Sequence, residues 1–395
     1  MLNQFKNQIS SWMLMHKNEP VLTMDVLDRN ATILDITSVF NVSHAPLGTV
    51  NENKEIDITK LETWFGKRAI PASRAHIEDF LSQQNIPNTR SLSFKGFGLN
   101  LSDQYWVKLE KTSLRWSQVN FFENEFSETF GEVLTSAGNS KNESIDFLSP
   151  DTSVDGWLEK KWVISNGTRG LLKGWNPLYK QEPYNEKIAT DIMNLLNIPH
   201  IPYEITVVKN KVYSWCETFV DAKTELIPAV DIVKHTPQIE GDTRLTHLLR
   251  GCDILGMDVY EVKLALDKMI VIDFLIGNYD RHWRNFGFIR NAETLEWLGF
   301  APIFDSGASL WQFHDEISMD NVKSMTFKTT LVEQLELLTD LSWYEKIDDE
   351  VLFNIVKRTL EKHPRMQEER LVKIAEQVVK NSNIIHDLKK KLDRK

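Results

Sequence analysis

The chain has 395 residues, of which 42% are hydrophobic and 10% aromatic, so it can bury a substantial core and is not a disordered chain. Its length predicts two or three domains, because one core usually organises about 100 to 200 residues. The 46 basic and 56 acidic residues give a net charge of -10. This charge argues against nucleic acid as the default partner, so we expect no direct nucleic-acid binding.

The cysteines and the hydropathy pattern indicate where the protein works. No stretch supplies the roughly 20 consecutive apolar residues that a membrane-spanning helix needs, so we expect no membrane association. Cys216 and Cys252 are the only cysteines, and they do not have the spacing of a zinc site. Two buried thiols in a reducing compartment are the simplest interpretation, and they predict a cytoplasmic protein.

Residues 1–135 are predicted to form an N-terminal accessory region of mixed α/β structure. The apolar pattern favours a strand at residues 21–27 and helices at residues 58–64 and 73–81. The polar, turn-rich run at residues 137–144 is typical of a connection between units, so we expect a boundary between residues 135 and 136. Nothing in this region indicates a separate activity.

Residues 136–222 are predicted to form a small β-rich lobe. Asn166 and Gly167 supply the positive φ values that a tight hairpin turn requires. Apolar spacing predicts the other elements. In chain order they are strands at 156–164 and 169–173, a helix at 184–196 that Pro199 ends, and strands at 203–209 and 212–219.

Residues 223–395 are predicted to form a larger α-helical lobe. From about Pro237 onward the pattern is helical, with its strongest amphipathic stretches at residues 263–276, 343–361 and 367–392. The expected fold class is therefore α+β, with a small β-rich unit followed by a larger helical one.

The most specific chemical signal lies at residues 278–286, directly after an apolar stretch, and continues at Asp305-Ser306-Gly307. Phosphoryl transfer requires a carboxylate that orients the attacking hydroxyl and oxygen ligands for magnesium. Asp280 followed five residues later by Asn285, with Asp305 downstream, has the spacing of a kinase catalytic loop. Each of these residues on its own could equally cap a helix or close a turn.

Other residues of this loop are interpreted more cautiously. His282 is expected to shape the loop through hydrogen bonds, because neither a nucleophile motif nor a paired histidine spacing accompanies it. Arg281 and Arg284 could meet phosphates, or could pair with local carboxylates and face solvent, and are left out of the candidate site.

A nucleotide site also needs a cation near the phosphates. Lys173, at the end of a predicted strand, is the candidate, and Glu186, at the start of the following helix, is its expected ion-pair partner. The ordinary alternatives are a strand-end lysine in water for Lys173 and an acid favoured by the helix dipole for Glu186. Ser153, in a turn-forming stretch that could cover phosphates, and Glu217 and Phe219, at the end of the strand 212–219, complete the candidate nucleotide-binding residues.

The loop, read as Asp280-Arg281-His282-Trp283-Arg284-Asn285-Phe286 after Ile276-Gly277-Asn278, resembles the HipA-like bacterial serine/threonine kinases. The resemblance covers about the last two-thirds of the chain. It implies a two-lobed kinase fold, ATP and Mg²⁺ as cofactors and a protein substrate with a Ser or Thr acceptor. It also implies that Asp280 is the catalytic base, that Asn285 and Asp305 hold magnesium, and that Lys173 contacts the nucleotide phosphates.

Some members of that family are toxins that pair with a DNA-binding antitoxin and are silenced by autophosphorylation of a loop serine. Ser153 is the corresponding candidate, although its surroundings differ from the Ser-x-x-Gly-Ala-Gln-x-Lys pattern of the family. The loop also resembles that of phosphoinositide kinases. A lipid or small-molecule kinase, and a nucleotide-binding pseudokinase or regulatory module, are therefore the alternatives.

Overall fold

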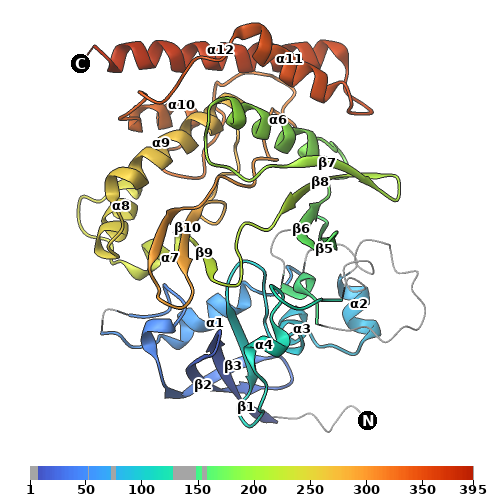
Figure 1. Ribbon diagram of the computed structural model, residues 1–395, viewed down its shortest axis with the longest axis vertical. Coiled ribbons are helices and arrows are strands. Elements are labelled where there is room, and N and C mark those ends of the chain that lie inside the picture. Colours follow the sequence, from blue (N-terminus) through green and yellow to red (C-terminus); the bar gives the residue numbers. More distant parts are fainter. Residues whose placement is uncertain (1–7, 52, 73–76, 128–147, 154–157, 395) are drawn as a thin grey trace.

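The computed structural model describes residues 8–51, 53–72, 77–127, 148–153 and 158–394 (Figure 1). Helices and three β-sheets make it an α+β protein, as the sequence predicts. Within these ranges no helix has both the length and the hydrophobicity needed to cross a membrane. Cys216 and Cys252 are both buried free thiols, as expected.

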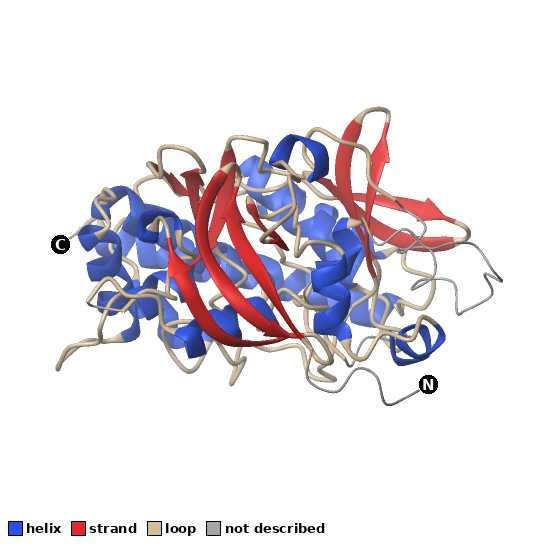
Figure 2. Ribbon diagram, turned by 90° about the horizontal axis from the view of Figure 1, so that it is seen from below, coloured by secondary structure: helices blue, strands red, loops and turns tan. Residues whose placement is uncertain are grey.

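The first sheet belongs to the N-terminal region and has the antiparallel order β3-β2-β1-β4. Figure 2 shows its long curved strands in front of the helices. The strand predicted at 21–27 and the helix predicted at 58–64 are confirmed. The helix predicted at 73–81 is confirmed from Ile77 onward, and residues 73–76 lie outside the described residues. The elements are β1 (Ile9–His16), β2 (Glu19–Leu27), β3 (Thr32–Val39), η1 (Val42–His44), α1 (Ile58–Gly66), α2 (Ile77–Gln83), α3 (Thr89–Lys95), β4 (Tyr105–Leu109) and α4 (Trp116–Val119).

The second sheet has the order β5-β6-β8-β7, and α6 packs against it. Asn166 and Gly167 have φ values of 50° and 80°, so the predicted hairpin turn is confirmed. The first strand begins at Lys160 rather than at residue 156, and residues 154–157 lie outside the described residues. The elements are η2 (Pro150–Ser153), β5 (Lys160–Ser165), β6 (Thr168–Lys173), α6 (Glu182–Leu195), β7 (Glu204–Val208) and β8 (Lys211–Glu217).

The third sheet, β11-β10-β9, was not predicted. It joins β9 (Thr224–Pro228) to β10 (Gly287–Asn291) and β11 (Trp297–Phe300). Two strands therefore interrupt the region after Pro237, which is otherwise mainly helical as predicted. These strands are short, and β10 pairs with β9 about sixty residues earlier, which local periodicity cannot reveal. Gly287 marks the pairing, because a Cβ atom there would overlap the carbonyl oxygen of Ile227.

The helices of the C-terminal half share one large hydrophobic core with α6. The helix predicted at 343–361 begins only at Asp349, because the side chain of Asp348 caps it by accepting hydrogen bonds from the backbone of Glu350 and Val351. The elements are α7 (Ala229–His235), α8 (Arg244–Ile254), α9 (Val259–Ile276), α10 (Leu331–Gln334), η3 (Leu335–Leu337), α11 (Asp349–Leu360) and α12 (Glu368–Leu392).

Side chains from distant segments hold these parts together. Trp162 of β5 packs in a buried cluster with Trp106 and Trp116 of the N-terminal region. A second contact joins β1 to the third sheet: Glu225 pairs with His16 at 3.0 Å and with Arg290 at 2.6 Å, and all three side chains are buried. The N-terminal region is therefore packed against both of the other sheets.

Candidate active site

The loop after α9 is built on a buried ion pair. Gly277 ends the helix in the left-handed conformation (φ 61°) and turns the chain toward Asn278. Asp273, inside the last turn of α9, accepts hydrogen bonds from Asn278 Nδ2 at 2.8 Å and from Arg281 Nε at 3.0 Å. The shape of the loop is thus fixed by a carboxylate in the middle of an otherwise apolar helix end.

Arg281 connects this loop to the second acidic segment. Its Nη1 atom donates to the carbonyl oxygen of Asn285 at 2.9 Å and to that of Phe304, and its Nη2 donates to Ser306 Oγ at 3.1 Å. The side chain is 1% exposed, so the suggestion that Arg281 faces solvent is wrong, whereas pairing with a local carboxylate is correct. Arg281 therefore holds the loop 278–286 against the segment that carries Asp305.

Helix α12 supports α9 from behind. Asn381, which is fully buried, donates from Nδ2 to the carbonyl oxygens of Phe274 and Leu275, each at 3.1 Å. These carbonyls belong to the last turn of α9, where the regular hydrogen bonds of the helix end. The helix that leads into the loop is thus tied to the C-terminal helix.

The candidate catalytic residues lie in one cleft. Asp280, Asn285 and Asp305 all line a cavity of about 890 Å³. Asn285 Nδ2 donates to the backbone oxygen of Asp280 at 3.0 Å, which leaves the amide oxygen as its possible metal ligand. Asp305 has a φ of 58°, a left-handed conformation that is uncommon outside glycine and occurs at functional sites.

Lys173 and Glu186 form the predicted ion pair, and both are buried. Lys173 Nζ also contacts Asp305 Oδ1 at 2.7 Å. Although burial disfavours its charged form, Asp305 and Glu186 raise the pKa of Lys173 well above its usual value. Burial likewise opposes ionisation of Asp305, but the cations Lys173 and Lys160 hold its pKa well below the usual range. A surface role in water for Lys173 is therefore wrong.

Asp280 differs from Asp305 in its electrostatic surroundings. Burial raises the pKa of the Asp280 carboxyl, and the charge of Asp305 acts in the same direction, while His282 opposes both. Residue 282 also shapes the loop as expected, since its Nδ1 accepts from the backbone of Arg284 at 3.2 Å. Two neighbouring carboxyls with opposite pKa shifts are typical of a proton acceptor beside a metal ligand.

The remaining candidate nucleotide-binding residues line the same cleft or have side chains outside the described residues. Glu217 and Phe219 both line it, and Phe219 stacks on Phe304 with ring centroids 5.4 Å apart. Leu171 packs with these two rings against the same buried cluster, and together they give the cleft an apolar wall suited to a nucleobase. Ser153 ends the η2 turn, but its side chain lies outside the described residues.

The residues present fit a magnesium ion held partly by a nucleotide. Among the described residues no group of three or more His, Cys, Asp and Glu side chains gathers into a complete metal cage. Magnesium bound with nucleotide phosphates takes only one or two carboxylates from the protein. The oxygen donors of Asp305 and Asn285 match that requirement.

Sequence reasoning missed several residues of the site. Tyr203 accepts a hydrogen bond from the backbone of Asp305 at 3.4 Å, and Lys173 Nζ lies 5.0 Å from the centroid of its ring. The sequence does mark Asp273, which is a single acid between Ile272 and Phe274 in an apolar run. Burying such a carboxylate costs free energy unless it is paired. Nothing in the local sequence marks Tyr203.

Comparison with known proteins agrees with this geometry. No protein-family model matches the chain. The serine/threonine-protein kinase CtkA of Helicobacter pylori (strain J99) is 29% identical over 150 residues, which are 37% of this chain and 46% of CtkA. The chain therefore matches less than half the length of this curated relative.

The fold has solved counterparts. The HipA structure from the Shewanella oneidensis MR-1 complex of HipA, HipB and operator DNA matches over 96% of this chain and 99% of HipA. Its TM-score is 0.60 and its identity 10%. A crystal structure of H. pylori CtkA matches over 60% of this chain and 94% of that one, with a TM-score of 0.48 and 21% identity. The sequence match to CtkA and the fold match to HipA together support the resemblance to the HipA-like kinases.

Proposed function

We propose that this protein is a HipA-like serine/threonine protein kinase that transfers the γ-phosphate of ATP to a protein hydroxyl. The observation that carries the proposal is the convergence of Asp280, Asn285, Asp305 and Lys173 in one cleft. A turn or helix cap would explain each residue singly, but not their meeting from β6, the loop after α9 and the segment after β11. The match to the kinase CtkA supports the same reaction.

In the proposed mechanism, Asp280 orients the acceptor hydroxyl and takes its proton. The Asp280 carboxyl lies in the cleft. Its raised pKa brings its proton affinity closer to the value that suits a general base. Asp305 stays ionised beside Lys173 and is suited, with Asn285, to hold magnesium. A bound magnesium–ATP would supply the phosphoryl group and neutralise charge that develops on it.

Lys173 is proposed to bind the nucleotide phosphates. Glu186 positions its ammonium group, and the contact with Asp305 keeps the cation beside the metal ligands. The sheet β5–β8 with α6 would then be the small lobe and the region from residue 223 the large lobe, with the boundaries 135/136 and 222/223 that the sequence predicts. The apolar wall of Phe219 and Phe304 is proposed to take the adenine, with Glu217 beside it.

The test is phosphate transfer from radiolabelled ATP with magnesium to proteins of a cell lysate. Asp280→Asn should reduce transfer about 10² to 10⁴-fold, because a general base contributes that much. Nucleotide binding should be nearly unchanged. Asp320→Asn, which neutralises an exposed acid of the same type, is the matched control and should transfer phosphate like the natural protein.

The other candidate functions are separate outcomes of this test. Label that enters lipid vesicles or small molecules instead of protein would favour a lipid or small-molecule kinase. Measurable ATP binding without transfer to any acceptor would favour a pseudokinase or regulatory module. Equal transfer by Asp280→Asn and the natural protein would refute Asp280 as the base.

Two further properties follow from the family resemblance. We propose a cytoplasmic location, consistent with the free thiols of Cys216 and Cys252. A DNA-binding antitoxin partner is proposed because the HipA counterpart was solved together with HipB and operator DNA. Phosphopeptide mapping after incubation with ATP would reveal whether Ser153 is autophosphorylated.

A further inference from the structure

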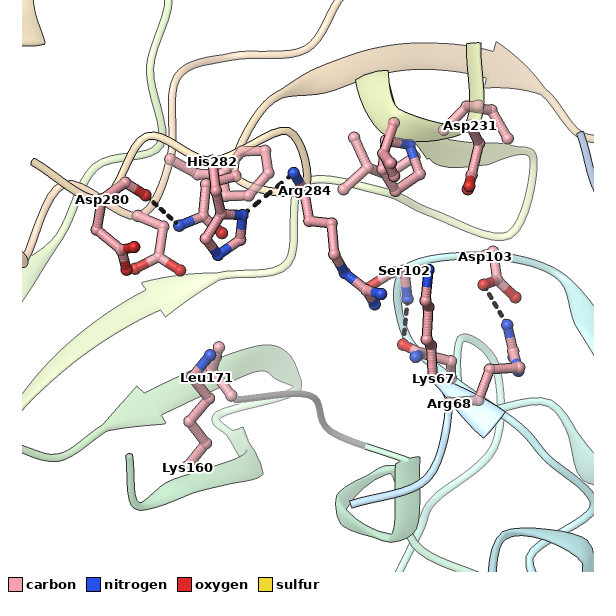
Figure 3. A pocket seen from close by; sticks show the side chains of 18 of the residues that line it. Lys67, Arg68, Ser102, Asp103, Lys160, Leu171, Asp231, Asp280, His282 and Arg284 are labelled. Atoms are coloured by element: carbon pink, nitrogen blue, oxygen red, sulfur yellow. Dashed lines mark hydrogen bonds and ion pairs between the residues drawn. The ribbon is translucent and has the colours of Figure 1, made fainter. Parts of the chain in front are cut away.

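A group of cations extends the cleft beyond the candidate catalytic residues. Lys67 caps the C-terminus of α1, Lys234 lies on α7, and Arg284 lies on the loop between Asp280 and Asn285. All three line the same cavity as Asp280. Figure 3 shows Arg284 leaving the loop toward the side chain of Lys67, away from Asp280. We call these three residues the basic cluster.

The cluster is held together by packing between distant segments. Gly48 of the N-terminal region has a φ of 81°, and a Cβ atom there would lie 3.1 Å from the backbone oxygen of Asp231 and 3.2 Å from Cβ of Lys234. The N-terminal region therefore lies directly against α7. Lys67 is brought to the loop of Arg284 by the fold, although 217 residues separate them (284 − 67).

Two of the three residues in the basic cluster, the lysines, lack an ion-pair partner among the described residues. Within the described ranges neither Lys67 nor Lys234 forms an ion pair, and Asp231, which lines the same cavity, forms none. Burial, followed by the proximity of Lys234 and Arg284, lowers the pKa of Lys67 to about 8. Burial raises the pKa of Asp231 to about 6, against the effect of the three cations. Cations that gather in a cleft, where burial and neighbouring positive charge lower the pKa of Lys67, form a site that favours an anion.

This arrangement is unexpected for the chain as a whole. The net charge of the protein is -10, whereas the basic cluster places positive side chains together inside the cleft. Low-dielectric walls focus such a local field and concentrate ligands of opposite charge. The cluster adjoins the acceptor side of the site, because Arg284 lies four residues after the proposed base, whereas the proposed phosphate-binding Lys173 belongs to β6.

We infer that the basic cluster is a subsite for the phosphate acceptor, and that it selects a protein segment carrying a carboxylate or phosphate group close to the acceptor Ser or Thr. This inference rests on the proposed kinase function and names its substrate class. A peptide fits better than a lipid headgroup, because the cations lie inside a cleft between the N-terminal region and α7. Each charge-assisted contact should contribute about a tenfold preference.

The experiment compares two synthetic peptides with the full-length protein. One carries a serine flanked by aspartates, and its twin has asparagines at the same positions. The natural protein should phosphorylate the acidic peptide at least tenfold faster at low peptide concentration. The double variant Lys67→Ala/Lys234→Ala should lose most of that preference, with an unchanged KM for ATP. Lys111→Ala, which removes an exposed lysine of the N-terminal region, is the matched control.

A binding arm separates failure of the inference from failure of the proposed function. Calorimetric titration at pH 8 should reveal tighter binding of the acidic peptide and proton uptake, because an anion beside Lys67 raises its pKa. Both signals should disappear in the double variant. If phosphate is transferred to both peptides equally, the inference is wrong and the kinase function stands. If no peptide is phosphorylated, equal binding of the two peptides still refutes the subsite, whereas a preference lost in the double variant upholds it.

The lipid alternative is tested in parallel. Vesicles of neutral phosphatidylcholine with or without a phosphoinositide are offered as acceptors under the same conditions. Selective labelling of phosphoinositide with no labelling of either peptide would overturn the assignment to a protein segment.

Discussion

Two buried charge networks in this molecule have similar composition and different surroundings. In the candidate site, Lys173 meets the acids Glu186 and Asp305 at the wall of a large cleft. Between β1 and the third sheet, Arg290 and His16 meet Glu225, where each residue is at most 4% exposed. We call the first the cleft network and the second the interface network. Access to the cleft, more than charge or burial, distinguishes the two networks.

The interface network is also more completely satisfied. Glu225 contacts both His16 and Arg290, and Arg290 Nη2 additionally donates to the hydroxyl of Tyr105 at 3.2 Å. The ring of Tyr105 stacks on His16 with centroids 4.3 Å apart. In the cleft network, by contrast, Asp305 keeps a side chain that is 30% exposed toward the cavity. Changes in the two networks should therefore affect different measured properties.

The largest effect is expected from Arg290→Met. Removing one partner leaves the buried carboxylate of Glu225 with only His16, which should lower the free energy of unfolding by about 3 to 5 kcal/mol. Urea denaturation would measure the change. Transfer activity per folded molecule should be unaffected at low temperature, and a variant as stable as the natural protein would contradict a structural role for the interface network.

Lys173→Met makes the matching change in the cleft network. Loss of the cation should reduce phosphate transfer about 10² to 10³-fold, the usual effect of removing one preorganised donor at a site of developing charge. The free energy of unfolding should fall less than in Arg290→Met, because Asp305 reaches the cleft. Steady-state kinetics together with urea denaturation test both statements, and unchanged kinetics would argue against a phosphate-binding role.

Acid should weaken the interface network. Burial opposes ionisation of Glu225, but Arg290 and His16 lower its pKa to about 2, compared with 4.5 in the unfolded chain. A depressed pKa stabilises the fold above pH 4.5, and this contribution is lost as the pH falls from about 4.5 toward 2. The loss should reach about 3 kcal/mol. Glu225→Gln, measured by urea denaturation over this range, should lack this part of the pH dependence.

The smallest effects are expected from removing single hydroxyl groups. Tyr105→Phe deletes one hydrogen bond of the interface network and should cost about 1 kcal/mol of stability without altering kinetics. Tyr203→Phe deletes the hydroxyl beside the backbone of Asp305 and should change KM for ATP or the transfer rate more than the thermal midpoint. Thermal unfolding and kinetics of the two variants should be measured side by side. A kinetic change in Tyr105→Phe together with a stability loss alone in Tyr203→Phe would contradict the distinction between the networks.

Local sequence carried the information for the elements that are defined by periodicity or turn chemistry. The hairpin at Asn166-Gly167 and the long helix α12 could be predicted because their signals lie within a few residues. The spacing of Asp280, Asn285 and Asp305 likewise sufficed to expect that these residues meet. Their individual catalytic roles stay predictions.

Contacts between distant segments could not be predicted. The pairing of β9 with β10 and the approach of Lys67 to Arg284 both depend on the tertiary fold. Arg281 was left out of the candidate site because it could meet phosphates or pair with local carboxylates and face solvent. In the structure Asp273 and several carbonyl oxygens surround it. The sequence therefore indicated the centre of the site better than its supports and its outer wall.

The hydrogen bonds from Asn381 to the end of α9 have a consequence for synthesis on the ribosome. Residues 280 and 305 leave the exit tunnel well before residue 381, because translation runs from the N-terminus and the chain folds as it emerges. A nascent chain that already contains every candidate site residue therefore still lacks the Asn381 side chain that donates to the Phe274 and Leu275 carbonyls. We expect the last turn of α9 and the loop after it to be fully ordered only when translation has passed α12.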